Sequence, residues 1–424
     1  MKLDFSKSVV LRGLASTFIK GFGAIFNYLL TFLIAMKFGA EGNGIFALFM
    51  SIVVICSSIL YFGFDTFLVR EFSTYDEGFK KKQNALYSFV FIRFFSNLLF
   101  LSILVSLTAF AFGKQLYGII SFSIFLNIFI DINAAVLRGI KQAEWYSYFT
   151  QMGKNLTLLI LMLFFSFDTE NTSIILWLYL LGLLINAILI FRIVRSKTGY
   201  PISRELMLEF NFKIRDVFLS TKDFWLSSTL VFSMLWVDFI VIDFFLGKTE
   251  SGIYSVALKL ANLVTFAFMA FNAFLAPKIS EEFNQGNLRG LQKLISLNFI
   301  AVFPMLLIPF LLILLFPTTL LSFFGEEFVD GKMILILLAT AQFINGILGP
   351  VSIILQMTGY QRVFQRVLTW VFFLKLIAIM LLVKEFGLFG VAVATFSSIV
   401  LWTVIGSYLV RRKLKIYSRY NNLI

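Results

Sequence analysis

The chain has 424 residues, of which 59% are hydrophobic and only 14% are charged, whereas a soluble domain carries about 25% charged residues. Apolar stretches of about 20 residues recur along it, and each can cross about 30 Å of hydrocarbon as a helix. The composition excludes a soluble protein and predicts an all-α, polytopic membrane protein. The single cysteine, Cys56, and the lack of histidine exclude an intrachain disulfide, a metal site and imidazole chemistry.

In chain order, the apolar runs and their polar breaks predict twelve spans. They lie at 11–36, 45–69, 84–112, 116–137, 145–167, 173–194, 217–246, 252–277, 292–316, 332–357, 364–384 and 388–410. With both termini cytoplasmic, 26 of the 36 Lys and Arg residues fall on cytoplasmic segments and five on outer loops. This asymmetry follows the positive-inside rule, so the net charge of +13 reports topology, and nucleic acid is not an expected partner.

One short motif occurs twice, at the outer hairpins after the first and seventh spans. "FGAEGNGIFAL" at 38–48 matches "LGKTESGIYSV" at 246–256, so that Gly39 pairs with Gly247 and Gly44 with Gly252 at a constant offset of 208. Because six spans per half is an even number, the halves form a parallel repeat about an axis along the membrane normal.

The repeat predicts two six-helix lobes. They occupy 1–196 and 216–424, joined by a cytoplasmic linker at 197–215. A weaker pairing joins "VLRGIKQ" at 136–142 to "LQMTGYQ" at 355–361, at the inner ends of the fourth and tenth spans.

Charged residues inside the spans are the main functional signal, because each costs about 2.5–3.5 kcal/mol at a helix centre. Lys154 and Lys375 lie about ten residues, or about 15 Å, from the nearest span end, so we expect both to line a central cavity. The cations proposed to bind an anionic substrate there are Lys20, Arg93, Lys154, Lys259 and Lys375.

Embedded acids leave a second interpretation open, in which the cations form structural ion pairs. Lys259 with Asp238 is one such pairing, and Asp65 and Asp131 near span ends are further candidates for ion pairing or coupling. The cations are not duplicated, since residue 20 corresponds to Ser228 at the 208 offset. Proline and glycine interrupt helices, so the candidate hinge in the tenth span is formed by Gly346, Gly349 and Pro350.

Four segments carry a resemblance to a known family. They are "RGLASTFIKGFGAIFNYLLTFLIAMKFGAEGNGIFAL" at 12–48, "GFDTFLVREFS" at 63–73, "WVDFIVIDFFLGKTESGIYSVALKL" at 236–260 and "FGLFGVAVATFSSIVL" at 386–401. The chain resembles the O-antigen flippases of Wzx type, in the polysaccharide-export branch of the multidrug/oligosaccharidyl-lipid/polysaccharide superfamily. The resemblance covers nearly the whole chain and implies MATE-like lobes around a cationic cavity.

The resemblance also implies a function. The expected activity is translocation of undecaprenyl-pyrophosphate-linked oligosaccharide, an O-antigen or capsule repeat unit, across the bacterial inner membrane by alternating access, without a cofactor or covalent chemistry. Polysaccharide polymerase and chain-length regulator are the implied protein partners. The alternatives are a cation-coupled multidrug or other lipid-linked precursor exporter of the superfamily, and an O-antigen polymerase. A drug exporter favours an acidic cavity, and a polymerase a large outer loop.

Overall fold

The structure is a computed structural model that describes residues 2–73, 80–108, 117–164, 171–199, 202–210 and 212–414. Every element in these residues is helical. The chain forms two compact units, each assembled from two separate stretches. Unit 1 comprises Met1–Ile34 and Phe49–Trp236, and unit 2 comprises Ala35–Leu48 and Val237–Ile424.

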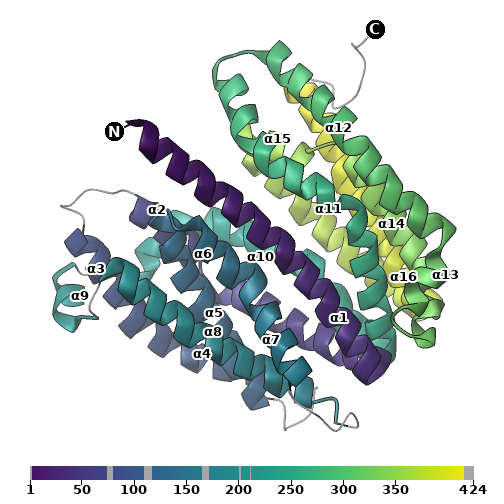
Figure 1. Cartoon of the computed structure of the whole chain (residues 1–424), viewed down its shortest axis with the longest axis horizontal. Helices are drawn as coiled ribbons and strands as arrows, with labels where there is room; N and C mark the ends of the chain where they lie inside the picture. The colour runs from purple at the N-terminus through teal and green to yellow at the C-terminus, as the bar shows by residue number, and fades with distance from the viewer. Residues whose placement is uncertain are drawn as a thin grey trace. The chain divides into compact units, whose positions relative to one another are not determined.

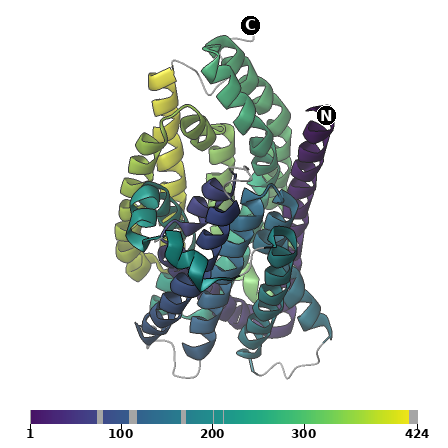
Figure 2. The same ribbon diagram turned by 90° about the vertical axis from the view of Figure 1, so that its left-hand side faces the viewer.

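Unit 1 contains the helices of the first half, except for Ala35–Leu48 of α1, which belongs to unit 2 (Figures 1 and 2). Their bounds are α1 (Lys2–Leu60), α2 (Phe64–Ser73), α3 (Lys80–Phe89), α4 (Phe95–Thr108), α5 (Tyr117–Gly139), α6 (Ala143–Ser147), α7 (Gly153–Phe164), α8 (Ile174–Thr198) and α9 (Arg204–Phe210). Two π-helices, η2 (Val90–Phe94) and η4 (Tyr148–Met152), interrupt the third and fifth spans. The α5 helix packs against α2, α4 and α8, and α7 packs against α8.

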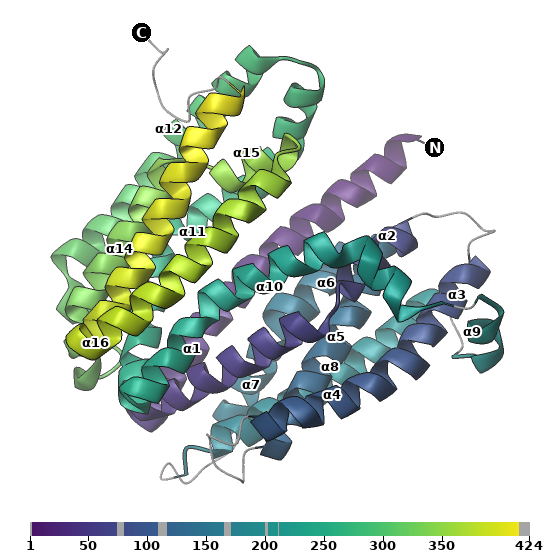
Figure 3. The same cartoon turned by 180° about the vertical axis from the view of Figure 1, so that it is seen from behind.

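Unit 2 is organised around α11 and α16, which run along α14 (Figure 3). The bounds are α10 (Ile214–Phe245), α11 (Lys248–Asn284), α12 (Leu288–Leu315), α13 (Pro317–Ser322), the 3₁₀ helix η5 (Glu326–Gly331), α14 (Lys332–Ile347), α15 (Val351–Met357) and α16 (Gln361–Leu414). The first part of α10 belongs to unit 1 and its end to unit 2.

Some of the helices in the structure correspond to more than one predicted span, because a kink divides them. Seven helices are long and apolar enough to cross a membrane, or eight if α14 and α15 form one broken span. The longest two, α1 and α16, have 59 and 54 residues, more than twice the length that about 30 Å of hydrocarbon requires. Non-helical glycines, Gly39 and Gly387, divide each into two crossings. The protein is therefore a polytopic helical membrane protein.

The duplicated motif makes the same turn twice. Gly39 has φ 65° and Gly247 has φ 101°, both in the left-handed region that favours glycine. Each ends one helix and starts the next, so the chain reverses direction within a residue or two. A side-chain carboxylate holds the first turn, because the Ala40 N–H donates to Glu327 Oε1 at 2.6 Å.

The second glycine of each motif brings the two copies together inside unit 2. A Cβ atom on Gly44 would lie 1.7 Å from the carbonyl oxygen of Lys248, and one on Gly252 would lie 1.8 Å from that of Ala40. Residues 40 and 248 are themselves related by the 208 offset. The two contacts are thus equivalent under exchange of the copies, as a two-fold repeat requires. Backbone contact this close explains why both copies carry glycine.

The boundary between the units differs in position from the predicted linker. The sequence places it at 197–215, of which residues 200, 201 and 211 lie outside the described part of the chain. In the structure, the boundary between the two compact units lies between Trp236 and Val237, within α10. Residues of the linker are attached to unit 1: Lys81 Nζ binds Glu209 Oε1 at 2.6 Å, and the Ser203 N–H donates to Ser88 Oγ at 3.0 Å.

The candidate hinge falls at a break in the helix. The α14 helix ends at Ile347 and α15 begins at Val351, with a 42° bend between them. Gly346 is the penultimate residue of α14, Gly349 has φ 87°, and Pro350 precedes the first residue of α15. The break follows from the missing N–H and the fixed φ of proline. Movement at this bend stays a prediction.

Alanine at either central glycine should destabilise the fold. Gly44→Ala and Gly252→Ala each place a methyl group against a backbone carbonyl, and overpacking costs about 1–3 kcal/mol. The matched control is Gly21→Ala, where the added Cβ meets nothing within 4 Å and helix propensity favours alanine by about 1 kcal/mol. Thermal unfolding in detergent should rank Gly21→Ala at or above wild type and the other two below it. Equal melting temperatures for all three variants would contradict the contact.

Cysteine accessibility tests the orientation. In a Cys56→Ser background, single cysteines at Glu41 and Glu326 should react with an impermeant maleimide added outside intact cells, because we place these residues on outer loops. Cysteines at Lys141 and Gly286 should react only after the membrane is permeabilised. All four side-chain positions are exposed in the structure. Labelling of Lys141→Cys in intact cells would overturn the orientation derived from the basic residues.

Candidate functional site

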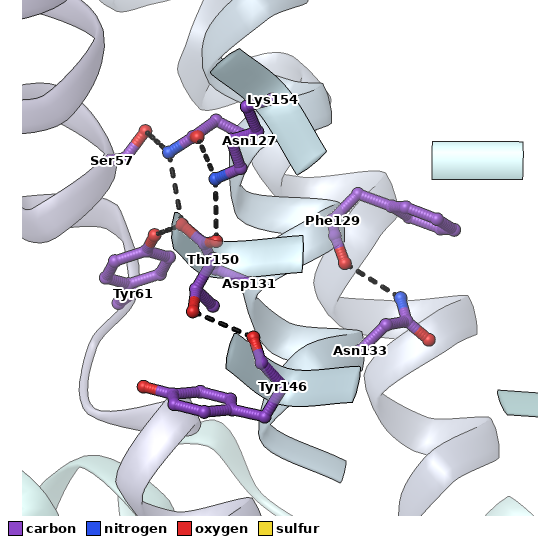
Figure 4. A network of polar contacts seen from close by, with 9 residues as sticks. All are labelled: Ser57, Tyr61, Asn127, Phe129, Asp131, Asn133, Tyr146, Thr150 and Lys154. Carbon is purple, nitrogen blue, oxygen red and sulfur yellow. Dashed lines mark hydrogen bonds and ion pairs between the residues drawn. The ribbon is translucent and has the colours of Figure 1, made fainter. Parts of the chain in front are cut away.

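Unit 1 contains an ion pair embedded among its helices (Figure 4). The Lys154 Nζ atom lies 2.8 Å from Asp131 Oδ1 and donates to Asn127 Oδ1 at 2.6 Å. Asp131 and Asn127 are four residues apart on α5, so they share one face of that helix, and Lys154 is the second residue of α7. The lysine approaches both groups from the neighbouring span.

Ser57 in the last turn of α1 and Tyr61 just after this helix complete the network. The Tyr61 hydroxyl donates to Asp131 Oδ2, and Asn127 Nδ2 donates to both Ser57 Oγ at 3.2 Å and Asp131 Oδ2 at 3.3 Å. Three separate segments therefore supply the donors that hold one carboxylate. The side chains of Lys154 and Asp131 remain 12% and 20% exposed, so the pair is not fully enclosed.

Local irregularities in the backbone position Lys154. The π-helix η4 ends two residues before it, and such insertions are common at functional sites. Gly23 of α1 packs directly on this π-helix, since a Cβ there would lie 2.8 Å from the Gln151 carbonyl oxygen. On the other side, Asn186 of α8 donates to the Gly153 carbonyl at 3.4 Å and to Thr157 Oγ1 at 2.8 Å. The start of α7 is thereby held between α1 and α8.

Unit 2 contains a second Lys–Asp pair with a different environment. Lys375 Nζ contacts Asp238 Oδ1 at 2.8 Å and Oδ2 at 2.9 Å. The hydroxyls of Tyr254 and Thr395 each donate to Asp238 Oδ2 at 2.8 Å. The group joins α10, α11 and both sides of the Gly387 kink in α16. The side chains of Lys375 and Asp238 are 2% and 1% exposed.

The Lys154–Asp131 and Lys375–Asp238 pairs differ in burial, and this difference indicates different roles. We expected Lys375 to line a cavity, but its side chain is enclosed within unit 2 and its charge is compensated by Asp238. We therefore assign Lys375 to the packing of unit 2. The partner of Asp238 is Lys375 rather than Lys259, which the sequence offered as one pairing. Lys154 is the more exposed of the two lysines.

The other candidates are distributed over both units. Lys20 on α1 and Arg93 inside the π-helix η2 are exposed, while Lys259 on α11 and Asp65 in the first turn of α2 are partly buried. Their binding roles stay predictions.

Sequence reasoning did not single out several polar residues of these networks. Asn127, Tyr61, Tyr254 and Thr395 all contact an embedded carboxylate. The Asn127–Asp131 spacing of four residues on an apolar helix was a usable signal for a polar face. Arg138 was also missed. It lies in the last turn of α5 with its guanidinium 5.0 Å from the centre of the Tyr146 ring.

The fold belongs to a known class of membrane proteins. The structure of the lipid II flippase MurJ in an inward closed conformation matches with a TM-score of 0.71 and 17% identity, over 95% of this chain and 87% of MurJ. An inward-facing MATE family multidrug resistance transporter of the MOP superfamily matches with a TM-score of 0.68 and 12% identity, over 93% and 94% of the two chains. The chain thus has the two-lobe fold of MATE and MurJ proteins.

Sequence comparison identifies the family. Residues 9–283 match the polysaccharide biosynthesis protein family, and the chain belongs to it. A curated relative from Haloferax volcanii, a probable low-salt glycan biosynthesis flippase named Agl15, is 26% identical over 190 residues. That match spans 44% of this chain and 40% of the relative's length.

The buried pair in unit 2 predicts a stability phenotype. Lys375→Met leaves Asp238 charged and uncompensated, which should lower the free energy of unfolding by about 3–5 kcal/mol. Adding Asp238→Asn should recover most of this loss, because the double variant buries no unpaired charge. Tryptophan fluorescence during thermal unfolding in detergent measures both. A single variant as stable as wild type, or a double variant no better than the single, would contradict the structural assignment.

Proposed function

We propose that the protein is a flippase that moves undecaprenyl-pyrophosphate-linked oligosaccharide, an O-antigen or capsule repeat unit, from the cytoplasmic to the periplasmic leaflet. Movement proceeds by alternating access of the two lobes across the inner membrane, with the termini cytoplasmic. The family supports a role in polysaccharide biosynthesis, and the fold supports transport. No covalent step is needed, so the protein acts as a transporter and not as an enzyme.

The physical problem such a protein solves is desolvation. A sugar pyrophosphate would lose the hydration of its charges and hydroxyl groups in hydrocarbon, at a large cost in free energy. A polar path that supplies hydrogen bonds and positive charge removes most of this barrier, while the prenyl tail stays in the bilayer. Polysaccharide polymerase and a chain-length regulator are the partners proposed to act on the translocated product.

The observation that carries the proposal is the partly exposed Lys154–Asp131 pair in unit 1. Its ammonium group already binds an anionic oxygen at 2.8 Å and an amide oxygen at 2.6 Å. A phosphate oxygen presents the same chemistry with more charge. Tyr61 and Asn127 also donate to Asp131 and remain to hold the carboxylate when the lysine turns to the substrate. The pair therefore keeps the unoccupied site neutral and supplies a cation to the phosphate.

Variants of Lys154 should change transport more than stability. A charge-assisted contact is worth about 1.5–3 kcal/mol, so Lys154→Ala should lower transport by about ten- to a hundredfold at equal protein level. Lys154→Arg should retain more activity because it keeps the charge. Complementation of a bacterial strain lacking its O-antigen flippase, scored by surface polysaccharide, measures the effect.

The double variant Lys154→Met with Asp131→Asn separates binding from structure. If Lys154 binds the substrate, the double variant keeps the transport loss of Lys154→Ala although no unpaired charge remains. If the pair only stabilises unit 1, the double variant should recover activity. Lys375→Met with Asp238→Asn is the matched control in unit 2 and should transport near the wild-type rate. Full activity of Lys154→Ala at normal expression would remove the main physical support for the proposal.

A further inference from the structure

Three neutral amide side chains form a row across unit 2, which we call the amide seam: Asn262 on α11, and Gln342 and Asn345 on α14. Gln342 Nε2 donates to Asn262 Oδ1 at 2.7 Å, and Asn345 Nδ2 lies 3.5 Å from Gln342 Oε1. At the other end of the row, the Thr403 hydroxyl on α16 donates to Asn345 Oδ1 at 3.2 Å. The seam therefore joins α14 to both of its long neighbours, α11 and α16 (Figure 3).

The amide seam lies deep within the membrane-spanning part of unit 2. Gln342 is about ten residues, or about 15 Å, from the start of α14, and Asn262 lies about 21 Å from the start of α11. All three side chains of the seam are partly exposed. Amides exposed to lipid tails would lose the hydrogen bonds that they make with water. We therefore expect the face of unit 2 that carries the seam to meet water or a polar ligand.

Amides with a structural role have a different environment in this protein. Asn186 of unit 1 is fully buried, and its Nδ2 atom donates to three acceptors on α7 and α8. Asn133 is also buried, and it donates to the Phe129 carbonyl at 2.8 Å (Figure 4). In the amide seam, Asn262 Nδ2 donates to no acceptor in the described part of the chain. The seam thus keeps hydrogen-bonding capacity that the structural amides have used.

A small cavity next to the amide seam contains a further amide, Asn298 of α12. The cavity lies where α14 breaks, and it is lined by Gly346, which follows Asn345, and by Gly349 and Pro350. Its other lining residues are aromatic or aliphatic, and an apolar lining with a few polar groups is typical of ligand sites. Asn298 is 8% exposed and has no hydrogen-bond partner among the described residues. Because a buried amide without a partner destabilises a protein, Asn298 points to a ligand that provides one.

The chemistry of these side chains suits a sugar. Each amide has N–H donors and an oxygen acceptor, so it can both donate to and accept from a hydroxyl group. A lysine side chain only donates and an aspartate only accepts, so neither matches a hydroxyl group alone. We propose that the amide seam and Asn298 form a subsite for the sugar hydroxyl groups of the lipid-linked oligosaccharide, an assignment that rests on the proposed function.

Two lipids that differ in the presence of the sugar test the subsite. One is the lipid-linked repeat unit extracted from cells depleted of this protein, and the other is undecaprenyl pyrophosphate. Their affinities for the purified full-length protein in phosphatidylcholine nanodiscs are measured by microscale thermophoresis. Wild type should bind the sugar-linked lipid about tenfold more tightly or better, because the sugar adds several hydrogen bonds.

Apolar substitutions of similar size should reduce this preference for the sugar. Gln342→Met and Asn298→Leu should each weaken binding of the sugar-linked lipid by about three- to tenfold, as expected for one lost hydrogen bond. Neither should change the affinity for undecaprenyl pyrophosphate. Gln356→Met is the matched control, because Gln356 is an exposed glutamine of unit 2 in the last turn of α15, outside the amide seam. It should keep the wild-type preference.

Melting temperatures separate ligand binding from folding. Asn298→Leu removes no hydrogen bond within the described residues, so it should melt at or above the wild-type temperature while its binding of the sugar-linked lipid weakens. A purely structural seam predicts that Gln342→Met melts lower and loses affinity for both lipids equally. That result for Gln342→Met would overturn the assignment. So would the same ratio of the two affinities in wild type, Gln342→Met and Asn298→Leu.

Failure of the subsite and failure of the proposed function give different results. If depletion of the protein leaves no lipid-linked repeat unit to extract, the proposed function fails and the subsite falls with it. If the repeat unit accumulates on depletion but wild type binds it no more tightly than undecaprenyl pyrophosphate, the proposed function stands and the subsite is wrong.

Discussion

A charge placed inside a membrane must find its counter-charge within the helices that surround it, and this constraint organises both units. Among the described residues, each unit contains an embedded lysine that is paired with an aspartate. In unit 2 the pair Lys375–Asp238 is closed off and further held by two hydroxyl groups. In unit 1 the pair Lys154–Asp131 is not fully enclosed. The same electrostatic requirement thus produces a structural contact in one unit and a candidate ligand contact in the other.

The two halves of the chain repeat the same backbone features, and the residues that we propose for function are those that differ between the halves. Gly44 and Gly252 make equivalent backbone contacts, and Gly39 and Gly247 make equivalent turns. These positions are symmetric because backbone geometry has to be the same in both halves. The cations are not symmetric, and the substrate that we propose, with one pyrophosphate, needs only one binding path. Unequal charge on a repeated backbone is what a transporter with a single cargo requires.

Much of the fold was predictable because its determinants are local. Apolar length predicts a polytopic helical membrane protein, and the repeated glycines predict the two matching turns; both are confirmed by the structure. The pairing of Lys375 with Asp238 was not predictable, because 137 residues separate them and the choice depends on which helices pack together. The π-helix before Lys154 and the contact between Arg138 and the Tyr146 ring also depend on packing against neighbouring helices.

The leaflet on which lipid-linked repeat units accumulate when the protein is depleted tests the central claim most directly. In a cell that depends on this protein, the account predicts accumulation on the cytoplasmic leaflet, where the sugars are inaccessible to an impermeant enzyme added to spheroplasts. Re-expression of the wild-type chain should make them accessible and restore polymer. Accumulation of unpolymerised units on the periplasmic leaflet would instead show that translocation proceeds without the protein, and it would contradict the account.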